Sequence, residues 1–132
     1  MFSVIFPGQG SQLVGMGQEF HDKYDLVKKL FKEADEILQA PLSKLILEGP
    51  KDELDLTINT QPAIFLISYS IFNVVKNKFN IDLNKARYFA GHSLGEYSAL
   101  CSAGYLSFKD TIRILKIRGE AMQNAVPKGK VG

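Results

Sequence analysis

The sequence predicts an α/β fold with a largely parallel sheet, because two strand-like runs alternate with helix-like segments. The runs cover residues 2–6 and 87–91, and each is short, apolar and followed by a glycine-containing turn. A Gly-x-Ser-x-Gly motif at residues 91–95 marks the point where the second run meets a helix. Two strands are too few for a self-contained sheet of the usual size.

The N-terminal half begins with the first strand, which Pro7 ends. Residues 13–20 predict a short helix, although two glycines weaken it. Residues 25–38 predict a clearer helix, with one apolar stripe and its charged residues largely outside that stripe. Residues 42–47 predict one or two further turns.

The C-terminal half contains three further helix signals. A long helix is predicted from residues 59–62 to about Phe79, because polar capping residues and a first-turn proline mark a helix start. It is apolar on most sides, which predicts a helix packed inside the molecule. A small-residue helix is predicted at residues 95–103, and a last one from Ser107, where capping-box spacing begins, to about Ala125.

The composition excludes several classes of function. The chain has 132 residues, 45% hydrophobic and 23% charged, and its net charge of +2 is too weak for a nucleic-acid-binding protein. One cysteine and two histidines provide no disulfide and no metal cluster, and we expect Cys101 to be a buried thiol. The longest apolar run, residues 63–67, is far below the roughly 20 residues of a membrane span. No signal peptide is visible, so we expect a cytoplasmic protein.

Ser93 is the candidate nucleophile. At a strand-to-helix turn this motif exposes the serine hydroxyl, and Gly91 and Gly95 let the strand and the helix approach closely. The following helix points its N-terminus at the reacting centre, and the N–H of Leu94 can help bind an oxyanion. The alternative is a tight turn in which Ser93 caps the helix.

The loop at residues 8–12 and His92 are further candidates. A dinucleotide-binding turn would need glycine where this chain has Leu13, and the Gly-Lys-Ser/Thr run of a Walker A loop is absent. The loop could instead supply a second oxyanion donor, and the alternative is a plain turn. Adjacent residues at such a turn point in different directions, so His92 fits a substrate-contacting or structural role better than that of the base.

Arg118 lies on a predicted apolar stripe of the last helix. The other members of the stripe are Thr111, Ile114, Leu115, Ala121, Met122 and Ala125. A guanidinium on such a face needs a partner, and arginine fits a carboxylate with two parallel hydrogen bonds. The pattern leaves two partners open, namely an internal acid and the carboxylate of a substrate.

Four ordered blocks resemble the malonyl-CoA:acyl-carrier-protein transacylases, the loading acyltransferases of fatty-acid synthesis. The blocks are Phe6-Pro7-Gly8-Gln9-Gly10-Ser11-Gln12, Asn59-Thr60-Gln61-Pro62, Gly91-His92-Ser93-Leu94-Gly95-Glu96-Tyr97-Ser98-Ala99-Leu100, and Arg118-Gly119 with Met122-Gln123. The resemblance implies an α/β-hydrolase-like acyltransferase core with a parallel sheet, truncated before a small ferredoxin-like subdomain. Residues 1–126 would be the N-terminal part of the large subdomain, and residues 127–132 the start of the crossing to the missing small one.

The resemblance also implies residue roles. Ser93 would be acylated by malonyl-CoA, and the phosphopantetheine thiol of acyl carrier protein would then take the malonyl group. Gln12 and Leu94 would give backbone N–H groups to an oxyanion hole. Arg118 would hold the malonate carboxylate. No metal is implied, and no cofactor beyond the CoA thioester substrate and the phosphopantetheine of the partner.

The family's catalytic histidine lies far downstream of the serine, beyond Gly132, so we expect this chain alone to be poorly active. We expect the complete protein to be a monomer that binds neither nucleic acid nor membranes.

A serine esterase or lipase is one alternative, but it has no use for Arg118 and usually carries a His-Gly-Gly-Gly-type loop, which is absent. A second alternative is the acyltransferase segment of a polyketide synthase. The start at Met1, directly on the first strand, favours a free-standing enzyme over that alternative. A third is a non-catalytic module that binds carrier protein through basic residues, Lys109, Arg113, Lys116, Lys128 and Lys130.

Overall fold

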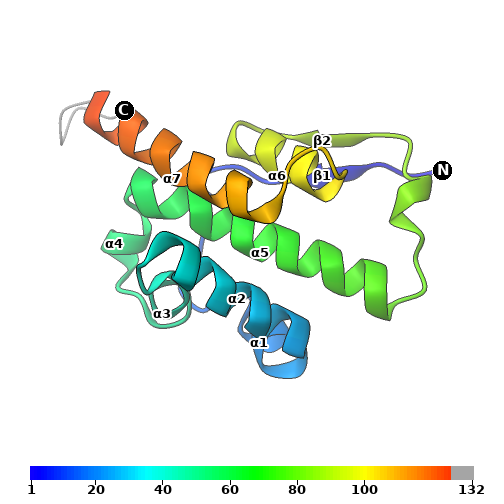
Figure 1. Cartoon of the computed structure of the whole chain (residues 1–132), viewed down its shortest axis with the longest axis horizontal. Helices are drawn as coiled ribbons and strands as arrows, with labels where there is room; N and C mark the ends of the chain where they lie inside the picture. The colour runs from blue at the N-terminus through cyan, green and yellow to red at the C-terminus, as the bar shows by residue number, and fades with distance from the viewer. Residues whose placement is uncertain (126–132) are drawn as a thin grey trace.

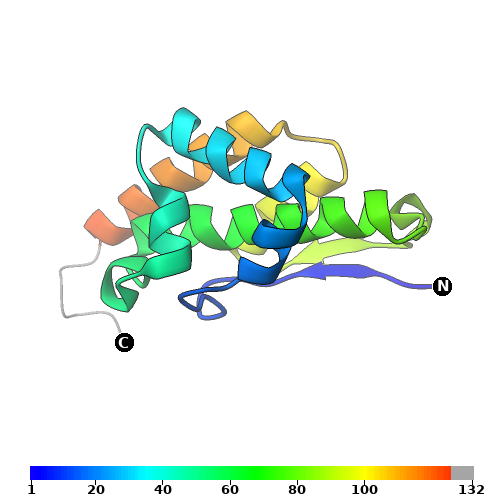
Figure 2. The same cartoon turned by 90° about the horizontal axis from the view of Figure 1, so that it is seen from below.

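The computed structural model describes residues 1–125, which place helices on one face of a short sheet (Figures 1 and 2). The elements in chain order are β1 (Val4–Phe6), α1 (Gln18–Lys23), α2 (Asp25–Leu38), α3 (Leu42–Glu48), α4 (Lys51–Leu54), α5 (Thr57–Lys78), the 3-10 helix η1 (Leu83–Lys85), β2 (Phe89–Gly91), α6 (Leu94–Ser102) and α7 (Phe108–Ala125). The predicted combination of helices with a parallel sheet is confirmed. The predicted crossing at residues 127–132 lies outside the described residues.

The sheet pairs residues 4–6 of β1 in parallel with residues 89–91 of β2. Phe6 is buried on the helical side, where its ring centroid lies 6.0 Å from that of Phe72 in α5. Ile5 points to the opposite face, because successive side chains of a strand alternate, and it is 77% exposed. Among the described residues, helices therefore cover only one face of the sheet (Figure 2).

The central helix α5 has the length and hydropathy of a membrane-spanning segment. In this structure, however, 61% of its most apolar window is buried inside the molecule. It packs against α2, α6 and α7, and its apolar side chains contribute to both hydrophobic clusters of the core. The prediction of a helix packed inside the molecule is therefore confirmed.

The predicted start of α5 is wrong, because the helix begins earlier, at Thr57. The polar residues that were expected to cap it have other partners. Asn59 Nδ2 donates to the Glu53 carbonyl at 2.9 Å, and Thr60 Oγ1 donates to the Leu54 carbonyl at 2.5 Å. These side chains tie the short helix α4 to the first turn of α5, so a capping pattern was mistaken for a helix boundary.

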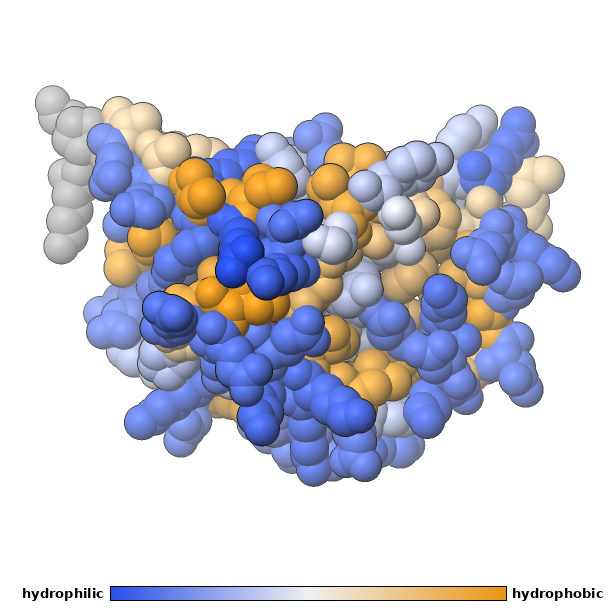
Figure 3. All heavy atoms as spheres, viewed as in Figure 1, coloured by the Kyte–Doolittle hydropathy of each residue, from blue (hydrophilic) through white to orange (hydrophobic). Residues whose placement is uncertain are grey.

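The buried face of α7 is rotated away from the predicted stripe. It consists of Phe108, Thr111, Ile112, Leu115 and Gly119. Ile114 and Met122 are instead 38% and 42% exposed, and apolar surface is visible over α7 in Figure 3. This orientation requires glycine at residue 119, because a Cβ there would lie 2.7 Å from the Thr57 carbonyl oxygen of α5. Arg118 consequently lies at the edge of the buried face and is half-buried.

Helices α3, α6 and α7 lie close to their predicted bounds, and α2 matches them fully. The short helices α4 and η1 were not predicted. Helix α1 begins at Gln18 rather than near residue 13. Gly15 and Gly17 adopt the left-handed φ values of 88° and 75°, so the chain turns there before the helix can start.

Candidate active site

Ser93 lies in the turn between β2 and α6 with φ 56° and ψ −114°. A residue with a side chain pays roughly 1–3 kcal/mol for such a conformation and keeps it only where the surrounding structure holds it. Ser93 occupies the N-cap position of α6, but its side chain makes no cap hydrogen bond. The alternative of a helix-capping serine is therefore wrong. The hydroxyl stays available at a strained strand-to-helix turn, as the motif predicts.

Gly91 and Gly95 make this turn possible, because at both positions two backbone segments lie so close together that a side chain would have no room. A Cβ at Gly91 would lie 1.9 Å from the Gly95 carbonyl oxygen, and a Cβ at Gly95 would lie 2.5 Å from the Phe6 carbonyl oxygen. The His92 N–H donates to that same Phe6 carbonyl at 3.3 Å. The turn is thus packed on the end of β1, and the predicted close approach is confirmed.

Replacing Gly95 with alanine in the full-length protein is expected to lower the free energy of unfolding by about 1–3 kcal/mol, because the new methyl group meets backbone that cannot step aside. The matched control is Ser102→Ala on the same helix, since the Ser102 hydroxyl is buried with no hydrogen-bond partner among the described residues. Thermal unfolding followed by circular dichroism should show a lower midpoint for Gly95→Ala only. Equal midpoints for the two variants would contradict the packing described here.

The loop after β1 packs against the turn that carries Ser93. A Cβ at Gly8 would lie 2.6 Å from the His92 carbonyl oxygen and 2.9 Å from His92 Nδ1. Gln9 Nε2 donates to Thr57 Oγ1 in the first turn of α5 at 3.1 Å. The loop is held between the Ser93 turn and α5, so it is part of the site and not a remote surface turn. The exposed His92 ring lies over this loop, and within residues 1–125 it makes no hydrogen bond to Ser93.

Gln12 anchors the far end of the loop with its side chain. Its Oε1 accepts from the Gly10 N–H at 2.8 Å, and its Nε2 donates to Asp55 Oδ1 at 2.8 Å. Hydrogen bonds from Lys51 and from Gln12 lower the pKa of Asp55, which keeps this anchor ionised. None of the hydrogen bonds found within residues 1–125 uses the backbone N–H of Gln12 or of Leu94. Their role as oxyanion donors stays a prediction.

Arg118 reaches the site from α7. Its Nη2 donates to Ser93 Oγ at 3.1 Å, and its Nη1 donates to Gln61 Oε1 at 2.7 Å. Its Cζ lies 5.4 Å from the centroid of the Tyr97 ring. No acidic side chain among residues 1–125 lies within 4.0 Å of the guanidinium, because the ion pairs found there are His21–Asp22 and Lys51–Asp55. An internal acid within the described residues is therefore excluded as its partner.

Sequence reasoning missed two residues of this site, Gln61 and Tyr97. Gln61 was interpreted as part of a helix start, but it lies inside α5, is 1% exposed and donates from Nε2 to the Met122 sulfur at 3.1 Å. A polar side chain at the edge of an apolar run was the available signal, since a buried amide needs partners. For Tyr97 the signal was its spacing, because it follows Ser93 by one helical turn.

Other candidates lie away from the site. Cys101 is buried, as predicted, and burial raises the pKa of its thiol. Of the basic residues considered for docking, Lys109 and Arg113 are exposed, and Lys116 is half-buried with a hydrogen bond to Asn59 Oδ1 at 3.3 Å. Burial lowers the pKa of Lys116. Lys128 and Lys130 lie outside the described residues.

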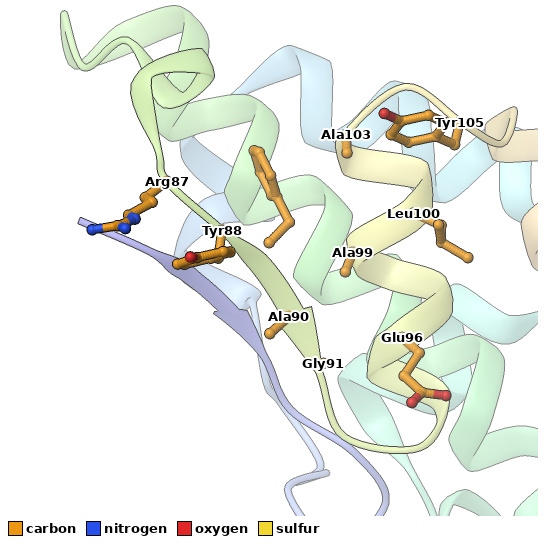
Figure 4. Close-up of a pocket in the computed structure, with 10 residues that line it drawn as sticks. Arg87, Tyr88, Ala90, Gly91, Glu96, Ala99, Leu100, Ala103 and Tyr105 are labelled. Atoms are coloured by element: carbon orange, nitrogen blue, oxygen red, sulfur yellow. The ribbon is translucent and has the colours of Figure 1, made fainter. Parts of the chain in front are cut away.

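A cavity of about 620 Å³ opens between β2 and α6 (Figure 4). Its lining includes all three residues of β2 together with Glu96, Leu100 and Tyr105. Neither Ser93 nor Arg118 lines it. The cavity is therefore separate from the candidate active site.

The comparisons with known proteins all point to the same family. The acyl transferase domain family matches residues 3–132. The chain is 49% identical over 126 residues to the malonyl CoA-acyl carrier protein transacylase of Bacillus subtilis (strain 168), covering 96% of this chain and 38% of that protein. It is 47% identical over 128 residues to the transacylase of the same name from Haemophilus influenzae, covering 97% of this chain and 40% of that protein.

Solved structures give the same result. An acyl-carrier-protein-S-malonyltransferase from Bartonella henselae superposes with a TM-score of 0.88 at 47% identity, over 96% of this chain and 40% of that one. A malonyl-transacylase in complex with a type II PKS acyl-carrier protein superposes with a TM-score of 0.87 at 43% identity, over 97% of this chain and 40% of that one. The chain thus spans about 40% of the length of these relatives.

Proposed function

Because the chain belongs to the acyl transferase domain family, we propose that the protein transfers a malonyl group from malonyl-CoA to the phosphopantetheine thiol of an acyl carrier protein. The observation that carries this proposal is the contact of 3.1 Å between Arg118 Nη2 and Ser93 Oγ. Malonyl carries its carboxylate one carbon away from the reacting carbonyl. A cation beside the nucleophile therefore suits this acyl group, and the names of the relatives support the same substrate.

The reaction proceeds in two half-reactions. Ser93 Oγ attacks the thioester carbonyl of malonyl-CoA, and the tetrahedral oxyanion is stabilised by the backbone N–H groups of Gln12 and Leu94. The intermediate collapses, the C–S bond breaks, and CoA leaves as the thiol with the proton that serine gave up. The thiol of the carrier protein then attacks the Ser93 ester, which transfers the malonyl group and restores the hydroxyl.

Arg118 provides the specificity in this proposal. Its guanidinium offers the remaining N–H donors to the malonate carboxylate, and His92 contacts the substrate from the rim of the loop. Acetyl-CoA has no carboxylate, so its acyl group would leave a half-buried cation without an anionic partner. The site therefore favours malonyl-CoA over acetyl-CoA.

The proposal extends to the architecture of the whole protein. Residues 1–126 form the N-terminal part of an α/β-hydrolase-like large subdomain, and residues 127–132 lead to a small ferredoxin-like subdomain. Two observations support this arrangement. Ile5 lies exposed on a sheet face that no described helix covers, and the chain spans about 40% of the length of its relatives. The general base is a histidine supplied by the remaining part of the protein. A cytoplasmic location, a monomeric state and the absence of a metal or further cofactor stay predictions.

A transfer assay with the full-length protein tests the proposed function. We expect rapid transfer of labelled malonyl from malonyl-CoA to carrier protein that bears phosphopantetheine, and none to carrier protein that lacks it. A neutral aryl ester measures the competing esterase activity. The serine hydrolase alternative predicts the opposite order, with the neutral ester turned over faster than malonyl-CoA, and that order would overturn the proposal.

A further inference from the structure

We propose that Tyr97 is a positioning residue for Arg118, and that its ring sets the preference for a carboxylated acyl group. The inference rests on the proposed function. Tyr97 lies on α6, one turn after Ser93, and its ring centroid is 5.4 Å from Arg118 Cζ. A cation over the face of a tyrosine ring is attracted by the ring quadrupole.

The guanidinium is held in its own plane by two hydrogen bonds. Gln61 Oε1 accepts from Nη1 at 2.7 Å, and Ser93 Oγ accepts from Nη2 at 3.1 Å. Both bonds end on neutral oxygens and start from the two terminal nitrogens, so rotation about the line between these nitrogens is not fixed by them. The face of the Tyr97 ring adds a third contact, because Arg118 Cζ lies over it at 5.4 Å from the centroid, and this contact restricts how the guanidinium can tilt. A bidentate contact with a carboxylate requires the two planes to be aligned.

The charge of the groups around Arg118 matters for substrate binding as much as their positions. An acid beside Arg118 would neutralise it and compete with the substrate carboxylate, and none lies within 4.0 Å among residues 1–125. The tyrosine ring and the Gln61 amide stabilise the cation without supplying a negative charge. Among residues 1–125, the hydrogen bonds found use one N–H of Nη1 and one of Nη2, so the other donors of the guanidinium remain for a substrate carboxylate. Tyr97 and Gln61 therefore hold the Arg118 side chain in place without neutralising its charge.

The ring is itself well anchored. Tyr97 is half-buried and packs against the main hydrophobic cluster from one side of α6. Ser93 is the N-cap of α6 and Tyr97 lies in its first turn, so the nucleophile and the ring are presented by the same end of one helix.

The experiment compares Tyr97→Leu with Tyr97→Phe in the full-length protein, measuring kcat and KM with malonyl-CoA and with acetyl-CoA. Loss of the ring in Tyr97→Leu is expected to raise KM for malonyl-CoA roughly tenfold, with a much smaller change for acetyl-CoA. Tyr97→Phe keeps the ring and should retain most of the malonyl preference. The control is Tyr105→Leu, because Tyr105 is 79% exposed and lies outside the site.

A structural role for Tyr97 would lower the activity with both substrates to the same extent, and that outcome would overturn the inference. A second test uses the Arg118→Ala background, where Tyr97→Leu should cause no further loss of malonyl preference. If Tyr97→Leu fails to fold, Tyr97→Met replaces it, since an unbranched side chain fills irregular space. A wild-type protein without malonyl preference would refute the proposed function itself, whereas a preference insensitive to the ring would refute only the role of Tyr97.

Discussion

Replacing Arg118 with alanine in the full-length protein is expected to lower kcat/KM for malonyl-CoA by roughly 10²- to 10³-fold. The value for acetyl-CoA should change little, so the preference between the two substrates collapses. The reason is that the variant removes the cation for the malonate carboxylate, whereas the acetyl group never used it. Steady-state kinetics with the two thioesters in parallel measure the effect.

Two controls separate the role of the guanidinium from that of a positive charge on α7. Arg118→Lys keeps a charge but loses the planar fork, so it should recover only part of the malonyl preference. Arg113→Ala removes an exposed arginine from the same helix and should leave both substrates unaffected. A malonyl-to-acetyl ratio that is unchanged in Arg118→Ala would refute the assignment of Arg118 as the carboxylate partner.

Replacing Ser93 with alanine is expected to reduce malonyl transfer by roughly 10⁴-fold or more, because the covalent route is lost and only binding and oxyanion stabilisation remain. Binding of malonyl-CoA should persist, since Arg118 is still present. The matched control is Ser102→Ala, which removes a hydroxyl from the same helix without breaking a hydrogen bond found among the described residues. Transfer that survives in Ser93→Ala would show that another group carries the acyl chain.

The two strands and most helix bounds followed from the sequence, because local signals determine them. Apolar runs, glycines and prolines mark where elements start and end, and α2 matches its predicted range. The start of α5 did not follow, because Asn59 and Thr60 bond back to the α4 turn, a contact that local capping rules do not describe. Tertiary packing, not propensity, decided that boundary.

The site was predicted in part. Ser93 and Arg118 could be singled out because one sits in a motif and the other is a charge on an apolar stripe. The orientation of α7 could not be predicted, because it depends on Gly119 meeting the Thr57 carbonyl, which is a contact between distant segments. The sequence carried only weak signals for Gln61 and Tyr97, and their contacts with Arg118 depend on that same orientation of α7.

The acyl-enzyme on Ser93 can be detected by intact mass spectrometry of the full-length protein, incubated with malonyl-CoA in the absence of carrier protein. We expect one added malonyl group, located by peptide mapping on Ser93, which disappears when carrier protein bearing phosphopantetheine is added. Ser93→Ala should gain no mass. A malonyl group on another residue, or transfer to carrier protein without any acyl-enzyme forming, would contradict the account.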